Sequence, residues 1–169
     1  CSACLIGQGT VPGKIEKIFI TTAAGEPMES VKSVTLEANK GIVGDRYHEH
    51  KGTYSKPSVI EPKRQLTLVT IEELDKFLAE HDLNLDHGDF RRNIVTSGID
   101  LNALVGQEFE VDGVRCRGIE TCEPCAYLAG MLSPLVLPHL VNKAGLRTEV
   151  LTTGEVKIGG AFTLGNSRE

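Results

Sequence analysis

The chain has 169 residues, enough for one domain that buries roughly 70% of the surface exposed by its unfolded chain. Asp and Glu number 23 against 18 Lys and Arg, and the resulting net charge of −5 excludes a bulk basic field for nucleic acid. No apolar run approaches the roughly 18 residues of a membrane-spanning helix, and the N-terminus lacks the pattern of a signal peptide, so we expect one cytoplasmic domain over residues 1–169 without a membrane partner.

The sequence predicts a protein built mainly from short strands. Its 18 glycines exceed the average usage of about 7%, and aromatic residues make up only 5%. Runs of alternating or β-branched residues, separated by glycine and proline, are typical of strands, and Asp112-Gly113 joins two of them as a hairpin turn. The predicted strands span residues 14–21, 31–38, 65–70, 92–96, 107–111, 114–120, 146–152, 155–158 and 161–164.

Helices and one long loop separate these strands. Thr70 and Glu73 form a capping box that starts a helix, and two more helices are predicted over 126–132 and 135–144. Residues 39–64 form an irregular loop of a length that is usually functional or disordered. Together these elements predict a mainly β (α+β) fold, a largely antiparallel barrel with two or three short helices, whose closure would remove exposed sheet edges.

Five cysteines, three of them between residues 116 and 125, point to reactive or metal-binding sulfur more than to a disulfide framework. In Cys122-Glu-Pro-Cys125, the second thiol precedes a predicted helix whose N-terminus would favour a thiolate. The residues alone leave three chemistries open: a four-thiolate zinc site that includes Cys1 and Cys4, a thioredoxin-like redox couple, or a single activated thiolate at Cys125. Burial as a small apolar side chain is the alternative, and it suits Cys116 best.

Several segments, in the same order along the chain, resemble the MOSC family, which is named after the C-terminal domain of molybdenum cofactor sulfurases. The similarity extends from about residue 13 to residue 164 and leaves 1–12 as a terminal extension. The matching segments are Gly41–His48, Arg64–Glu73, Asp89–Leu101, Gly106–Val111, Glu123–Leu128, Lys143–Leu151 and Gly154–Gly159.

The resemblance implies a β-rich barrel that binds the molybdenum cofactor (molybdopterin), in which a pterin phosphate holds molybdenum through a dithiolene. One branch of the family reduces N-hydroxylated compounds with a cysteine thiolate on the metal, and that cysteine corresponds to Cys125. A soft thiolate suits such a metal. We therefore expect a molybdenum-dependent oxidoreductase acting on N-hydroxylated small molecules. The alternative follows another branch, in which Cys125 carries a persulfide or the domain handles the cofactor during sulfuration, without reductase activity.

The resemblance also assigns a set of cofactor-binding residues, in which arginines would bind phosphate through two parallel hydrogen bonds. Asp45 and Arg46 leave a second interpretation open, a local salt bridge that shapes the loop. If residues 91–93 are a strand, Arg92 faces solvent. The expected cofactor-binding residues are Arg91, Asn93, Arg147, Asp45, Arg46 and Arg64.

Two further residues complete the predicted site. His48 is the candidate catalytic proton donor, because the charge of histidine changes near neutral pH. Cys125 is the predicted catalytic residue and the metal ligand. The sequence contains no dinucleotide or ferredoxin motif, so we expect a separate electron-donor protein or cysteine desulfurase as partner.

The sequence departs from the family's pattern in two places. Cys122 adds a thiol three residues before the family's cysteine, which raises the options of a persulfide carrier or a regulatory disulfide. Residues 158–161 read Ile-Gly-Gly-Ala where relatives often have Gly-Asp, so a turn carboxylate is missing.

Overall fold

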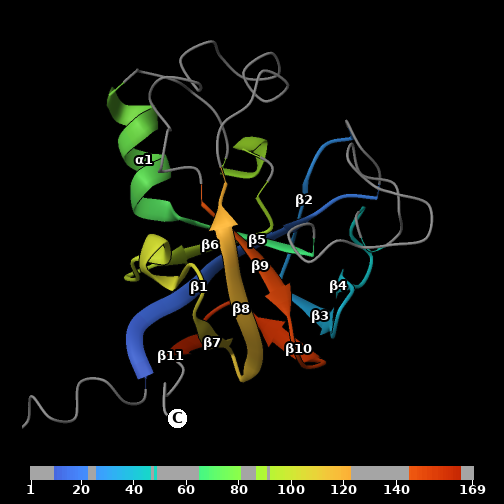
Figure 1. The fold of residues 1–169 in the computed structure, drawn as a ribbon. Helices are drawn as coiled ribbons and strands as arrows, with labels where there is room; N and C mark the ends of the chain where they lie inside the picture. The colour runs from blue at the N-terminus through green and yellow to red at the C-terminus, as the bar shows by residue number, and fades with distance from the viewer. Residues whose placement is uncertain are drawn as a thin grey trace, which may run out of the picture.

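The structure, a computed structural model, describes residues 10–22, 26–46, 48, 65–80, 87–90, 92–122 and 145–164. Within these residues strands predominate, accompanied by the α-helix α1 (Ile71–Glu80) and the 3-10 helices η3 (His87–Phe90) and η4 (Leu101–Leu104) (Figure 1). The strands are β1 (Thr10–Ile20), β2 (Glu29–Val31), β3 (Ser33–Glu37), β4 (Gly41–Ile42), β5 (Leu66–Thr70), β6 (Ile94–Ser97), β7 (Glu108–Val111), β8 (Val114–Thr121), β9 (Leu146–Val150), β10 (Gly154–Lys157) and β11 (Ala161–Leu164).

Seven strands close into a barrel in the order β11-β7-β8-β9-β5-β6-β1. The ring closes because β1 is long enough to pair with β11 through Thr10 and Lys14 and with β6 through residues 14–18. The last three residues of β1 pair with β2, which lies outside the ring. Neighbouring strands in the ring are antiparallel except β5 and β6, a parallel pair that needs the crossover through α1. The expected largely antiparallel, mainly β barrel is therefore confirmed.

The barrel wall carries apolar side chains on both faces where α1 covers it. Because successive strand residues point to opposite faces, Leu68 and Ile94 lie in the interior cluster while Val69 and Val95 point outward. The outward side chains pack with α1, which flanks the barrel in Figure 1. We call this second cluster the outer apolar cluster; its buried members are Phe19, Val69, Leu74, Phe77, Phe90, Val95 and Cys122.

A smaller sheet, with β3 between β10 and β4, completes the fold. Its buried residues Val34, Leu36 and Val156 belong to the interior cluster of the barrel, so the two sheets share one core. The loop after β4 begins with hydrogen bonds from Val43 N to Thr35 O and from Asp45 N to Ile42 O, each 3.0 Å. These bonds fix the start of the loop that carries the predicted site residues Asp45, Arg46 and His48.

Two predicted elements near the expected site can be compared with the structure. The capped helix is confirmed, because Thr70 Oγ1 accepts a hydrogen bond from Glu73 N at 3.4 Å and α1 begins at the next residue. The strand predicted over 92–96 is shifted, since β6 begins at Ile94 and Asn93 lies in a bend. The condition for predicting that Arg92 faces solvent is not met, because residues 92 and 93 precede the strand; Arg92 is half-buried and Asn93 is buried.

Some predictions fall outside the described residues. These are the helices predicted over 126–132 and 135–144 and most of the loop over 39–64. A single domain over residues 1–169 stays a prediction.

Candidate functional site

A row of polar residues crosses the outer face of the barrel. Thr67 of β5 lies opposite Arg147 of β9, and Arg147 lies opposite Glu120 of β8. Asn93, directly before β6, bonds to Thr67 from the other side. Because Leu68 points into the interior cluster, its neighbour Thr67 and the registered partners of Thr67 point outward. We call these four residues the polar row; it brings together Asn93 and Arg147, two predicted site residues that are far apart in sequence.

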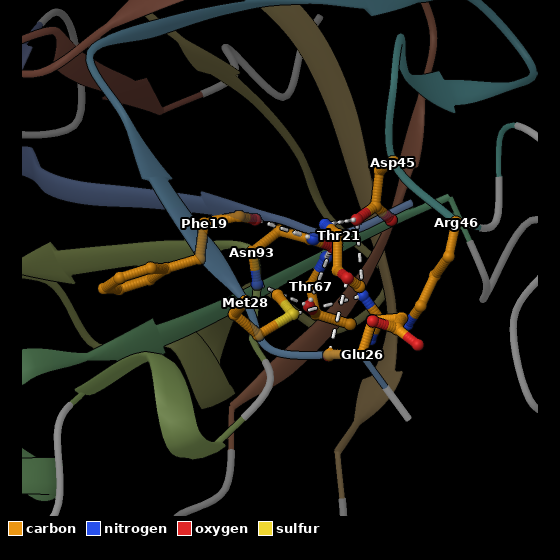
Figure 2. Close-up of polar contacts among 8 residues, drawn as sticks. All are labelled: Phe19, Thr21, Glu26, Met28, Asp45, Arg46, Thr67 and Asn93. Atoms are coloured by element: carbon orange, nitrogen blue, oxygen red, sulfur yellow. Dashed lines mark hydrogen bonds and ion pairs between the residues drawn. The ribbon is translucent and has the colours of Figure 1, made fainter. Parts of the chain in front are cut away.

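Asn93 joins three strands through hydrogen bonds inside the protein (Figure 2). Its Oδ1 accepts from Thr67 N at 3.3 Å and from Thr67 Oγ1 at 3.1 Å, and its Nδ2 donates to Phe19 O at 3.1 Å. The backbone N–H of Asn93 donates to Thr67 Oγ1 at 2.9 Å. Asn93 is buried, so these bonds fix the relative positions of β1, β5 and the start of β6. A contact between Asn93 and a cofactor stays a prediction.

Arg147 is the predicted phosphate-binding residue whose surroundings are described most fully. Its side chain is 21% exposed, and its Nε lies 3.4 Å from Glu120 Oε2. Among the described residues no other hydrogen-bond or ion-pair partner of the guanidinium occurs, so both terminal nitrogens keep their donors. A half-buried guanidinium with two parallel donors is suited to binding a phosphate or carboxylate.

Asp45 and Arg46 form a buried ion pair beside the end of β1 (Figure 2). Asp45 Oδ1 accepts a hydrogen bond from Thr21 N at 3.1 Å and lies 3.3 Å from Arg46 Nη1. The same Nη1 lies 3.5 Å from Met28 Sδ, directly before β2. These contacts agree with the alternative of a local salt bridge that shapes the loop. A contact of Asp45 or Arg46 with a cofactor stays a prediction.

His48 is held by a carboxylate that the sequence analysis missed. His48 Nε2 lies 2.7 Å from Glu37 Oε1, at the end of β3. The hydrogen bond with His48 is the main reason why the pKa of Glu37 is lowered from its ordinary value of 4.5, and Lys40 lowers it further. Glu37 is therefore ionised at neutral pH and accepts the Nε2–H of the imidazole.

The two cysteines among the described residues are both buried. Cys116 lies in the interior cluster, as predicted, and burial raises the pKa of its thiol to about 12. Cys122 lies in the outer apolar cluster with 0% of its surface exposed. Its backbone N–H donates to Gly145 O at 2.7 Å. Cys122 and Gly145, which end two described parts of the chain, are therefore adjacent in space, and Gly145 lies two residues before Arg147.

Three predicted site residues lie outside the described residues: Arg64, Arg91 and Cys125. Glu120, Thr67 and Glu37, by contrast, were not predicted. Neither their spacing nor their residue type distinguishes them, because each meets its partner through strand register or a loop contact. Within the described part of the chain, no group of three or more His, Cys, Asp or Glu side chains could hold a metal ion, and no helix is long and apolar enough to cross a membrane.

Comparisons with known proteins identify the fold and the family. The sequence profile of the MOSC domain matches residues 47–163, which is more than half of the chain. No curated protein has significant sequence similarity to the chain.

Solved structures with the same fold include proteins from three bacteria. The YuaD protein of Bacillus subtilis has a TM-score of 0.75 at 17% identity, covering 91% of this chain and 97% of that one. YiiM of Geobacillus stearothermophilus has a TM-score of 0.70 at 14% identity, covering 92% and 76%. YiiM of Escherichia coli has a TM-score of 0.61 at 17% identity, covering 93% and 70%. At these identities the similarity shows the fold alone.

Proposed function

Because the chain belongs to the MOSC family, we propose that it binds the molybdenum cofactor and reduces N-hydroxylated small molecules. The observation that carries this proposal is the state of Arg147, which lies half-buried on the polar row with both terminal nitrogens unpaired among the described residues. A buried or half-buried arginine normally satisfies its donors within the protein. Donors left open in this way support a phosphate-bearing ligand.

The described residues fit the phosphate of a pterin cofactor. Arg147 supplies two parallel donors and a positive charge, which are what a phosphate group requires. Asn93 and Thr67 bond to each other, so we assign them the role of fixing the strands from which Arg147 projects. Arg64 and Arg91, which lie beside the described Gln65 and Arg92 in sequence, are proposed as the remaining phosphate-binding cations.

When bound, the cofactor would supply the oxygen-atom and two-electron chemistry, and the chain's residues would orient it and provide protons. We assign Cys125 as the thiolate ligand of molybdenum. We assign His48 as the proton donor to the substrate nitrogen, with its imidazole oriented by Glu37. Asp45 and Arg46 hold the loop that leads to His48. A separate electron-donor protein would restore the reduced state.

The test is purification from a host that makes the cofactor and is supplied with molybdate. We expect molybdenum and pterin to copurify with the wild-type chain, and we expect reduction of a hydroxylamine with a reduced dye as artificial donor. Cys125→Ser should lose the activity and most of the metal. Cys122→Ala is the matched control, because it removes a thiol from the same segment. This variant should keep the activity and the molybdenum.

The same experiment distinguishes the sulfur-carrier alternative. A wild-type chain without molybdenum, carrying cyanolysable sulfane sulfur that Cys125→Ser loses, would overturn the reductase proposal in favour of a persulfide carrier. One zinc per chain, lost when Cys1 and Cys4 are replaced, would instead establish the thiolate zinc site that the sequence left open.

A further inference from the structure

The ion pair between Glu120 and Arg147 depends on an irregularity in the pairing of β8 with β9. Gly118 lies opposite Thr148, but the next registered partner on β8 is Glu120, opposite Arg147. Ile119 is therefore an extra residue, and the two strands form a β-bulge at this point. In a regular ladder Ile119 would lie opposite Arg147 and Glu120 would point to the other face. The bulge is what brings a carboxylate next to Arg147.

The bulge is held in place by backbone contacts on its N-terminal side. Gly118 N donates to Gln107 O at 3.0 Å, and Gly106 N donates to Gly118 O at 2.8 Å. Gly118 also packs so closely on η4 that a Cβ at this position would lie 2.1 Å from Leu104 O. Only glycine fits such a contact, so the local sequence maintains the irregular register.

The contact between Glu120 and Arg147 uses one edge of the guanidinium and leaves the other open. Glu120 Oε2 lies near Nε, 3.4 Å away, and not near the terminal nitrogens. The guanidinium is planar and its five N–H donors are fixed relative to one another. Holding Nε therefore sets the direction in which the Nη1 and Nη2 donors point.

We propose that Glu120 is a positioning residue, which sets the plane of Arg147 so that its terminal nitrogens receive a phosphate monoester. This inference rests on the proposed function, because the phosphate is that of the pterin cofactor. Among the described residues, Arg147 is the polar partner of Glu120, so Glu120 acts through the arginine. Its negative charge also balances the arginine while the phosphate site is empty, which keeps the half-buried cation stable.

The chain offers a matched control on the same two strands. Glu149 of β9 lies opposite Arg117 of β8, and Arg117 Nη1 lies 3.4 Å from Glu149 Oε1. The distance equals that of the pair between Glu120 and Arg147, but Arg117 also binds Glu108 and lies in the regular part of the ladder. Glu149→Ala therefore removes a comparable ion pair without disturbing Arg147.

The experiment measures release of pterin from the loaded protein during anaerobic dialysis, followed by pterin fluorescence after oxidation. Glu120→Ala should release the pterin about fivefold faster than wild type, the effect of losing roughly one exposed charge pair. Glu120→Gln should release the pterin at a rate within about twofold of wild type, because its amide oxygen can take the place of Oε2 beside Nε. Glu149→Ala should match wild type. In an Arg147→Ala background, the further change Glu120→Ala should have no additional effect.

Each other outcome overturns a specific statement. Unchanged or slower release from Glu120→Ala, with faster release from Arg147→Ala, would overturn the positioning role and leave the proposed function intact. Additive effects in the double variant would show that Glu120 acts independently of Arg147 and would overturn the positioning role. Absence of pterin from wild-type protein would overturn the proposed function itself.

Discussion

Cys116 and Cys122 occupy opposite faces of the barrel wall, Cys116 in the interior cluster and Cys122 in the outer apolar cluster. Both have 0% exposure, although they lie close in sequence to the proposed metal ligand Cys125. A cysteine reacts as its thiolate, and only where a reagent can reach the sulfur. Burial keeps reagents away from the sulfur of both cysteines. Burial therefore argues against Cys122 as a ready partner for a disulfide or persulfide, an option that its spacing from Cys125 had suggested.

We predict that iodoacetamide leaves Cys116 and Cys122 unmodified in the native protein at about pH 8 and modifies both in denaturant. For Cys116 there is a second reason, because burial raises the pKa of its thiol to about 12 and so disfavours the thiolate. Peptide mass mapping after timed labelling measures each cysteine separately, and the denatured chain is the control. Native labelling of Cys122 at the denatured rate would contradict this prediction and restore the Cys122–Cys125 couple.

Strand register determines which individual site residues the sequence could identify. Arg147 could be identified from its resemblance to the family's motif, and the structure places it on an outward-facing strand position. Glu120 could not, because a β-bulge decides that it faces Arg147. Asn93 was expected to contact the phosphate from a strand, but its bend and its bonds to Thr67 depend on the neighbouring strand β5.

Among the secondary-structure elements, the start of β9 depends on one glycine. Gly145 has a φ of +114°, a left-handed conformation that other residues rarely adopt. A Cβ at this position would also lie 2.1 Å from Leu68 O, a backbone atom of β5 that cannot turn away. The two constraints fix where β9 begins, at Leu146, one residue before Arg147.

We predict that Gly145→Ala destabilises the protein by about 3 kcal/mol, since it adds a steric clash to backbone strain. Urea unfolding measures the loss. Gly106→Ala is the matched control, because Gly106 also has a positive φ, +77°, but its added Cβ meets nothing within 4 Å. Gly106→Ala should lower the free energy of unfolding by only about 1 kcal/mol. Equal losses of stability in the two variants would show that the close contact of Gly145 with β5 adds nothing to the cost of the substitution.

The turn between β10 and β11 receives a carboxylate from the turn between β7 and β8. The sequence of residues 158–161, in and after this turn, contains no carboxylate. Asp112, in the hairpin turn between β7 and β8, accepts a hydrogen bond from Lys157 N at 3.1 Å. A Cβ at Gly160 would lie 2.6 Å from Asp112 Cβ, so the glycine makes room for this carboxylate. The hairpin turn was predictable from Asp112-Gly113. The hydrogen bond from Lys157 to Asp112 was not, because it depends on the long-range placement of the two turns.

At the scale of the whole molecule, the strand pattern predicted a barrel but not how it closes. Nearly all described strands overlap their predicted ranges, because alternation and turn residues are local signals. Closure depends on β1 pairing with both β11 and β6, and the parallel contact of β5 with β6 depends on the crossover through α1. These are long-range pairings, which no local pattern specifies.

Three strands of the closed barrel are linked on the outside by a ladder of ion pairs. Glu108 of β7 bonds to Arg115 and Arg117 of β8, and Arg117 bonds to Glu149 of β9. Because Arg117 and then Arg115 donate hydrogen bonds to Glu108, the pKa of this carboxyl is lowered from its ordinary value of 4.5. The ladder is exposed, so its contribution is small and is weakened by salt.

The lowered pKa of Glu108 determines how this contribution varies with pH. The carboxyl is ionised in the folded state at pH values where the unfolded chain already binds a proton. Its stabilising effect is therefore complete above 4.5, the ordinary value, and is lost as the pH falls through the lower value of the folded state.

We predict that Glu108→Gln lowers the thermal midpoint at neutral pH and low salt, and that its difference from wild type is lost as the pH falls through the lowered pKa of Glu108 in the folded state. Thermal melts followed by circular dichroism across this range measure the effect. Glu110→Gln, two residues along β7, is the control, because no ion pair involves Glu110 among the described residues; it should change the neutral midpoint less. A difference for Glu108→Gln that persists at low pH, or grows with salt, would mean that the carboxyl acts through packing and not through its charge.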